Sequence, residues 1–261
     1  MLLAIDAGNT QTHLGVFRGE KLTHEWRMST APDRTADELA LISGQFLELA
    51  DLSFSREITG VAICSVVPPL TQELRQMTER YFGFSAVVVE PGTRTGIAIK
   101  IDNPREVGAD RIANAVAANH MFPDEPSIVV DFGTAITVDA VSAKGEYLGG
   151  AITPGIETAA GALYQATAQI RRVELIAPSH AIGKSTIQAV QSGIVYGNAS
   201  LVDGLVERLS KEVGGTANVI ATGGQAHIVV KHCKLVDRIA PDLTLVGLRL
   251  IFERNFEERE H

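Results

Sequence analysis

Apolar residues recur along this chain with two periods, every second residue in some segments and every three to four residues in others. Short apolar and alternating runs predict strands at residues 3–7, 13–17, 21–29, 58–67 and 86–89, two more within 127–138, and others at 149–153 and 218–221. The longer period predicts helices at residues 35–49, 71–82, 108–120, 157–168, 186–196, 199–213 and 245–255. Residues 93–105 show neither period and are predicted to be irregular. Strands precede helices in each half, which is typical of α/β domains with mixed sheets.

Two local signals add boundaries to this pattern. Thr35 and Glu38 have the spacing of a capping box, which predicts a helix start at residue 36. The segment Pro123–Pro126 reads as a linker, because two prolines flank two acidic residues. We therefore predict an N-terminal domain of residues 1–123 and a C-terminal domain of residues 124–261.

The two predicted domains open with the same motif, an apolar strand that ends in Asp-x-Gly and is followed by a second apolar strand. Asp6, Gly8 and Thr12 match Asp131, Gly133 and Thr137 at a constant offset of 125 residues. Both returning strands lead to a charged turn. This internal repeat predicts duplicated domains, each beginning with a hairpin that carries a carboxylate at the same place.

The chemistry of the first turn suits a nucleotide triphosphate. Gly8 permits close approach of the backbone to phosphate oxygens, and the side chains of Asn9, Thr10 and Thr12 offer further donors. Asp6 is a candidate ligand for Mg²⁺, directly or through water. One such turn is equally well an ordinary hairpin with a polar tip. Two turns in register, each opening a half of the chain, favour convergence on one ligand.

Composition excludes several classes of function. The chain has 261 residues, 45% of them hydrophobic, and a net charge of −8 without a long basic run, so we do not expect it to bind nucleic acid. Cys64 and Cys233 are far apart and fit neither a disulfide framework nor a zinc site, and we expect buried, reduced thiols. The first apolar run stops at Asp6, and no stretch reaches the length of a membrane span. A soluble cytoplasmic protein is predicted, with no membrane partner.

Other polar segments have two interpretations each. Gly183-Lys184-Ser185 resembles the end of a P-loop, but Pro178 stands where that motif needs a glycine, so a helix start capped by Ser185 or Thr186 is preferred. Asp110 falls in the first turn of a helix, where it either stabilises the helix dipole or acts as a general base. Thr222-Gly223-Gly224 is either a plain turn or a close approach to a ligand. His13 is expected to be a solvated hairpin residue.

Taken together, these motifs resemble the actin and sugar-kinase superfamily, and within it the type III pantothenate kinases. The matching segments are Asp6-Ala7-Gly8-Asn9-Thr10, Asp102-Asn103-Pro104, Glu106 to Arg111, Asp131 to Ala135, Gly149-Gly150, Pro154-Gly155-Ile156, Gly183 with Thr186, Gln191-Ser192-Gly193 and Thr222-Gly223-Gly224. The resemblance implies two ribonuclease-H-like domains with the active site in the cleft between them. It also implies ATP-dependent phosphorylation of the primary hydroxyl of pantothenate to 4'-phosphopantothenate, the first step of coenzyme A biosynthesis.

The resemblance also implies roles for individual residues. Asp110 would be the catalytic base, and pantothenate would be bound by Gly108, Ala109, Asp110, Arg111 and Thr186. ATP phosphates would be bound by Asp6, Ala7, Gly8, Asn9, Thr10, Gln11, Thr12, His13 and Thr134. Asp131 would belong to the site of a monovalent cation, K⁺ or NH₄⁺, beside the Mg²⁺ at Asp6. Members of the family are homodimers.

One position departs from the family's pattern. Many members have a tyrosine before the Asp-Asn-Pro segment, in the pantothenate pocket, and this chain has Ile101. The expected catalytic groups are all retained. Two other functions therefore stay open, a kinase for another small hydroxylated acid or sugar, and a weakly catalytic regulatory protein on the same fold.

Overall fold

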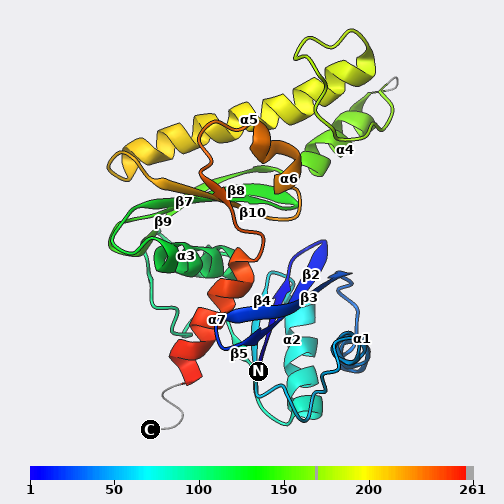
Figure 1. Cartoon of the computed structure of the whole chain (residues 1–261), viewed down its shortest axis with the longest axis vertical. Coiled ribbons are helices and arrows are strands. Elements are labelled where there is room, and N and C mark those ends of the chain that lie inside the picture. Colours follow the sequence, from blue (N-terminus) through cyan, green and yellow to red (C-terminus); the bar gives the residue numbers. More distant parts are fainter. Residues whose placement is uncertain (168–169, 257–261) are drawn as a thin grey trace. The chain divides into compact units, whose positions relative to one another are not determined.

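The structure is a computed structural model that describes residues 1–167 and 170–256. It divides into two compact units, each with its own sheet (Figure 1). The first unit contains Met1–Ile97, Asp102–Ala117 and the described residues from Leu243 onward; the second contains Ala98–Ile101 and Ala118–Asp242. Both units are therefore discontinuous in sequence, unlike the predicted domains 1–123 and 124–261, and that boundary stays a prediction.

The sheet of the first unit has five strands in the order β3-β2-β1-β4-β5. Its strands are β1 (Leu2–Ala7), β2 (Gln11–Arg18), β3 (Lys21–Ser29), β4 (Gly60–Ser65) and β5 (Val87–Val88). The first three form an antiparallel meander, and β4 and β5 continue the sheet in parallel with β1. The predicted mixed sheet is thus confirmed in this unit.

Four helices belong wholly or partly to the first unit. They are α1 (Ala36–Glu48), α2 (Pro68–Met77), which continues as a π-helical turn over Thr78–Phe82, α3 (Ala109–Met121) and α7 (Leu243–Phe256). The capping box at Thr35 is present and starts α1 as predicted. Helix α2 begins three residues earlier than predicted, because Pro68 and Pro69 occupy its first turn, where the missing N–H groups are not needed. A short 3₁₀ turn, Pro104–Glu106, precedes α3.

Helix α7 packs on β1, β4 and β2 of the first unit, although it lies at the end of the predicted second domain. The helix comes very close to the sheet: a Cβ on Gly15 would lie 2.7 Å from Leu245 Cδ1, and one on Gly60 would lie 2.2 Å from Phe252 Cζ. Two glycines of the sheet thus make room for α7 side chains. Such long-range fit has no signature in the local sequence.

The sheet of the second unit has six strands in the order β11-β10-β7-β8-β9-β6. Its strands are β6 (Ala98–Ile99), β7 (Ser127–Phe132), β8 (Ala135–Val141), β9 (Glu146–Pro154), β10 (Asn218–Thr222) and β11 (Arg238–Ile239). The prediction that residues 93–105 are wholly irregular is wrong at β6, which pairs in parallel with β9. Two residues are too few to produce a periodic pattern.

The helices of the second unit include α4 (Ile156–Ala166), α5 (Thr186–Glu212) and α6 (Ala226–Val229), the last followed by a 3₁₀ turn at Val230–His232. The prediction of separate helices at 186–196 and 199–213 is wrong, because α5 runs without a break. Asn198 lies between the two predicted helices, and its side-chain amide donates to the carbonyl of Ile194 within α5. The predicted helix end at residue 168 lies outside the described residues.

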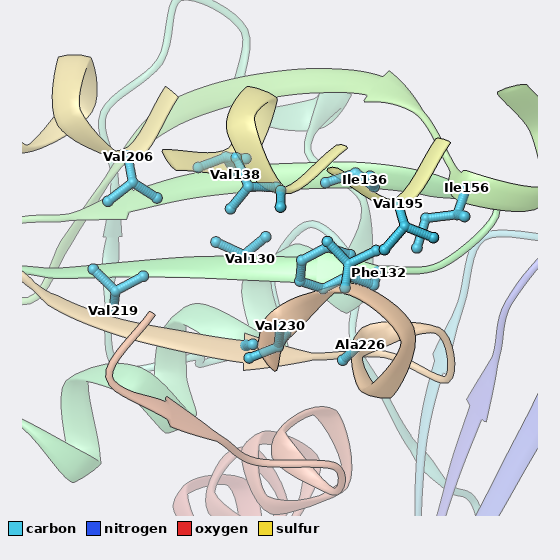
Figure 2. Close-up of a cluster of buried hydrophobic side chains, with 14 of the residues drawn as sticks. Val130, Phe132, Ile136, Val138, Ile156, Val195, Val206, Val219, Ala226 and Val230 are labelled. Atoms are coloured by element: carbon cyan, nitrogen blue, oxygen red, sulfur yellow. The ribbon is translucent and has the colours of Figure 1, made fainter. Parts of the chain in front are cut away.

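The core of the second unit lies between the sheet and its helices (Figure 2). Strands β7 and β8 contribute Val130, Phe132, Ile136 and Val138, and α5 contributes Val195 and Val206. All six are nearly or fully buried. The packed core holds β7 firmly up to Phe132, the residue next to the second Asp-x-Gly turn.

The two sheets confirm the internal repeat. Apart from β6, both have the same order, a three-stranded meander continued by two parallel strands. Each meander has a register shift at the same place, between Val16 and Phe17 and between Ala140 and Val141. The register also refines the alignment: Asp6 pairs with His13, and Asp131 pairs with Thr137. His13 is therefore the structural counterpart of Thr137, because the second loop is one residue shorter.

Among the described residues, no helix combines the length and the apolar character needed to cross a membrane. Cys64 and Cys233 are both free thiols, Cys64 buried and Cys233 half-buried. Burial raises the pKa of the Cys233 thiol to about 12, which keeps it protonated at neutral pH. The expectation of reduced thiols without a disulfide is confirmed, and full burial is confirmed only for Cys64.

Candidate active site

The first candidate element is the loop between β1 and β2. Asp6 is half-buried near the end of β1, and the N–H of Gly8 donates to the carbonyl of Gln11 at 3.1 Å, which closes the loop. Asn9, Thr10 and Gln11 are exposed at its tip. The tip residues, rather than the N–H of Gly8, therefore face a ligand in solution.

Thr12 and His13, at the start of β2, are buried in the first unit. Thr12 is 0% exposed and its hydroxyl lies 2.9 Å from that of Thr30. His13 is 5% exposed and its Nε2 lies 2.8 Å from a carboxylate oxygen of Glu25. The prediction of a solvated His13 is wrong, because β3 covers this side of β2. Both buried side chains therefore help to hold the conformation of the loop between β1 and β2.

The end of β4 supplies contacts that the sequence analysis missed. Cys64 is paired with Asp6 in the parallel register, and its Sγ donates to Oδ1 of Asp6 at 3.3 Å. Two residues later, the N–H of Val66 donates to the carbonyl of Ala7 at 3.1 Å. The apolar pattern identified this segment as a strand, but it gave no sign that the strand's end supports the loop.

Asp110 lies in the first turn of α3, as predicted. Its Oδ1 accepts the N–H of Arg111 at 2.8 Å, and a Cβ on Gly108 would come within 2.5 Å of the same oxygen. Glycine at position 108 therefore gives the carboxylate room to fold back over the helix start. The same hypothetical Cβ would lie 3.6 Å from Val66 Cγ1. Val66 is thus bound to the first loop through Ala7, and its side chain borders the space beside Gly108.

The second candidate element is the loop between β7 and β8. Asp131 is half-buried beside Thr222 of β10, and Gly223 follows with a φ of 91°. A Cβ on Gly223 would lie 2.5 Å from Oδ1 of Asp131 and 2.6 Å from the backbone of Phe132. Only glycine fits this position, on both conformational and steric grounds. Gly223 thus lies close to a carboxylate of the protein itself. A close approach of Thr222-Gly223-Gly224 to a ligand stays a prediction.

Residues after β9 hold the same loop from the other side. The N–H of Gly155 donates to the carbonyl of Thr134 at 3.0 Å, and the hydroxyl of Thr158 donates to that carbonyl at 2.7 Å. A Cβ on Gly155 would lie 2.3 Å from the carbonyl oxygen of Gly133. The Thr134 side chain itself is exposed. The loop backbone is therefore fixed while its tip stays accessible.

The remaining predicted residues of the second unit lie on other elements. Thr186 is the first residue of α5 and is exposed; Ser185 is the cap, and its hydroxyl accepts the N–H of Gln188. The preferred interpretation of this segment as a capped helix start is confirmed. Ile101 is half-buried, and a Cβ on Gly149 would lie 3.3 Å from its Cγ2. The aliphatic side chain at 101 thus packs against the β9 backbone.

A cavity of about 440 Å³ in the first unit lies between α1 and the aromatic residues Phe54 and Tyr81. None of its lining residues belongs to the loop after β1 or to the start of α3. This cavity is therefore separate from the candidate site, which rests on the arrangement of loops and carboxylates.

Comparison with known proteins agrees with this arrangement. The sequence profile of type III pantothenate kinase matches residues 2–208. Type III pantothenate kinases from Frankia alni and Streptomyces griseus are 54% and 52% identical to this chain, over 98% of it and over 100% and 98% of their own lengths.

Solved structures show the fold at much lower identity. Component A of the (R)-2-hydroxyglutaryl-CoA dehydratase of Acidaminococcus fermentans aligns with a TM-score of 0.58 and 17% identity, covering 100% of this chain and 99% of its own. The ROK hexokinase of Thermus thermophilus aligns with a TM-score of 0.52 and 14% identity, covering 98% and 99%. The two sheets have the actin and sugar-kinase fold predicted from the repeat. With half of its residues shared with such relatives over nearly its whole length, the chain belongs to the type III pantothenate kinase family.

Proposed function

We propose that this chain transfers the γ-phosphate of ATP to the primary hydroxyl of pantothenate, forming 4'-phosphopantothenate as the first step of coenzyme A biosynthesis. Family membership supports this reaction. The structural observation that carries it is that the loop with Asp6 and the helix start with Asp110 belong to the same compact unit. A phosphate-binding loop and a carboxylate that can accept a proton are the two parts that phosphoryl transfer to an alcohol needs.

Residues 6–13 and Thr134 are the proposed phosphate ligands. In the first loop, the exposed tip residues Asn9, Thr10 and Gln11 meet the phosphates, while Thr12 and His13 hold its shape. ATP brings a divalent metal ion, and the carboxylate of Asp6 is a hard oxygen donor of the kind that Mg²⁺ prefers.

Asp131 is the proposed ligand of the monovalent cation, K⁺ or NH₄⁺. A second oxygen lies near its carboxylate, since Asp131 Oδ1 and the carbonyl oxygen of Phe132 would both come within 2.6 Å of a Cβ on Gly223. A site of oxygen ligands suits a hard cation. When bound, such a cation would balance negative charge that the phosphates bring to this loop.

Asp110 is the proposed catalytic base. The amino end of α3 stabilises its negative charge, and the hydrogen bond from Arg111 N fixes the orientation of its carboxylate. As the phosphoryl group moves, the pantothenate hydroxyl gives its proton to Asp110 late in the transfer. Gly108, Ala109, Arg111 and Thr186 are the proposed contacts to the rest of the substrate.

We further infer that the enzyme acts as a homodimer in the cytoplasm. The start of α5 and the segment before it support a dimer, because apolar side chains there are exposed: Ile182, before the helix, is 82% exposed, and Ile187, in its first turn, is 57% exposed. Gly193 and Gly197 on the same helix have open space where a side chain would be. Exposed apolar surface next to small residues allows close approach of another helix.

The decisive experiment is release of ADP by the full chain with pantothenate, Mg²⁺ and K⁺. Asp110→Asn should lower kcat by at least about 100-fold, because removal of a general base costs roughly two to four orders of magnitude. Glu48→Gln, which changes an exposed carboxylate on α1, is the matched control and should leave kcat unchanged. No turnover by the wild type, or full turnover by Asp110→Asn, would refute the proposal.

A second function is favoured by one observation, Ile101. Loss of the tyrosine hydroxyl from the expected substrate pocket makes a kinase for another small hydroxylated acid or sugar conceivable. A panel of such acceptors separates the two, since a pantothenate kinase should prefer pantothenate over every other member. A weakly catalytic regulatory protein would give no turnover with any of them.

A further inference from the structure

Thr30, the residue that follows β3, makes three contacts to the first Asp-x-Gly loop. Its hydroxyl donates to the carbonyl of Gly8 at 2.7 Å and lies 2.9 Å from the hydroxyl of Thr12. Its backbone N–H donates to the carbonyl of Thr10 at 2.9 Å. One residue outside the motif therefore touches the loop at its beginning, its tip and its end.

The direction of these bonds follows from the number of protons. A threonine hydroxyl has one proton, and that of Thr30 is given to Gly8. Thr12 must therefore donate its own proton to Thr30 across the 2.9 Å contact. Since Thr12 is 0% exposed, its hydroxyl is committed to the loop's shape. The two hydroxyls form a chain that ends on the carbonyl of the loop glycine.

The internal repeat supplies an independent observation. At the offset of 125 residues, Thr30 corresponds to Gly155, which follows β9 as Thr30 follows β3. Gly155 also donates its backbone N–H to the facing loop, at the carbonyl of Thr134. Both units therefore fix the Asp-x-Gly loop from the same point, the first residue after the third strand. In the first unit a side-chain hydroxyl is added to this backbone contact.

We propose that Thr30 is a positioning residue for nucleotide binding: its hydroxyl fixes the carbonyl of Gly8 and thereby the exposed tip that meets the ATP phosphates. This inference rests on the proposed role of the loop in binding ATP. Thr30 itself need not touch the nucleotide. Without the hydroxyl, the loop keeps its strands but loses the bond that sets its tip, and the nucleotide must order the loop on binding.

The chain offers a matched control on the same strand. Thr23 also donates its hydroxyl to a backbone carbonyl, that of Val16, at 3.0 Å. It lies beside the register shift at Val16 and Phe17, away from the loop. Thr23→Val and Thr30→Val therefore remove the same kind of bond from the same strand, and only one of them concerns the phosphate loop.

The experiment measures KM for ATP and for pantothenate, together with binding of MgADP and of adenosine by calorimetry. Thr30→Val should raise KM for ATP and Kd for MgADP about tenfold, the usual effect of one lost hydrogen bond at a binding loop. KM for pantothenate and adenosine binding should change less than about twofold, because neither involves the phosphates. The change in kcat should be as small, because the loop, once ordered by the nucleotide, holds the ground state and the transition state alike. Thr30→Ser should behave as wild type, and Thr30→Cys, a weak donor, should lie between them. Thr23→Val should leave all five constants unchanged.

Each outcome is decisive. Unchanged MgADP binding in Thr30→Val, equal weakening by Thr23→Val, or equal weakening of adenosine overturns the proposal. If Thr30→Val does not fold, the order of Ser and Cys at position 30 carries the test, and equal Kd values for those two overturn it. Wild-type protein that binds MgADP but does not phosphorylate pantothenate refutes the proposed function alone, because the binding measurements still report on Thr30.

Discussion

The two Asp-x-Gly loops begin with the same residues, yet they differ in length and in what holds them. The first has three residues between its strands and the second has two. In the first, one residue, Thr30, supplies both a hydroxyl and a backbone N–H, whereas the second is held by the N–H of Gly155, the hydroxyl of Thr158 and the close approach of Gly223. Duplication preserved the topology and allowed each loop its own support.

The difference shows where each loop tolerates change. A Cβ on Gly8 would lie 3.1 Å from the carbonyl of Gln11, which a small shift can relieve, and one on Gly133 would have ordinary contacts. Cβ atoms on Gly155 or Gly223 would lie 2.3 to 2.6 Å from backbone atoms of the second loop. A side chain is thus tolerated better at the motif glycines, Gly8 and Gly133, than at the neighbouring glycines, Gly155 and Gly223.

The largest effect is expected from Gly223→Ala in the second loop. Its φ of 91° and the 2.5 Å approach to Asp131 Oδ1 both oppose a side chain. We expect a loss of about 2–4 kcal/mol in the free energy of unfolding, together with a loss of about 100-fold in kcat/KM for ATP. Urea denaturation and steady-state kinetics measure the two quantities.

Gly224→Ala is the control for that substitution, because a Cβ there meets no atom within 4 Å. It should leave stability within about 1 kcal/mol of the wild type, as most open positions do. Equal damage from both substitutions would mean that the whole turn, and not the contact with Asp131, limits the protein.

A smaller effect should separate the two carboxylates. Asp6→Asn should raise the Mg²⁺ concentration for half-maximal rate about tenfold, since one charged ligand is lost, and leave the K⁺ requirement unchanged. Asp131→Asn should do the reverse. Titrating each cation at saturating levels of the other measures both constants. If either variant shifts both cations equally, the assignment of one cation to each loop is wrong.

The smallest effect is expected from Thr158→Val. Its hydroxyl donates to the carbonyl of Thr134, but this carbonyl keeps the N–H of Gly155. Loss of a second, exposed hydrogen bond should cost about 0.5–1 kcal/mol of stability and change KM for ATP about twofold. Thr167→Val removes a similar bond, to Leu163, at the other end of α4 and should leave KM unchanged. A tenfold rise in KM for Thr158→Val would show that the second loop also depends on a side chain.

Local signals in the sequence predicted much of the fold. The capping box at Thr35 started α1, and the repeat of Asp6 at Asp131 predicted two sheets of the same design. Local signals did not predict features that depend on residues distant in the sequence, or elements of only two residues. Nothing near Gly60 indicated that Phe252 would fill the space beside it, and two residues of β6 have no period.

The candidate site was predictable to a similar extent. Residues with characteristic chemistry, such as Asp110, stood out because their neighbours form a motif. Val66 and Thr30 did not, since an apolar residue after a strand and a threonine after another are common in any chain. Their importance comes from backbone groups they meet across the sheet, at Ala7 and Gly8, and such partners cannot be read from the local sequence.

The position of α7 has a consequence for how the protein is made. Residues Leu243–Phe256 leave the ribosome after the whole second unit, yet they pack on β1 and β4, which leave it before most of that unit. The second unit is complete once β11 has emerged, whereas the first must wait with one side of its sheet uncovered. The first phosphate loop is therefore the last to reach its final form, and a chain cut short before Leu243 would carry a finished second unit and an unfinished first.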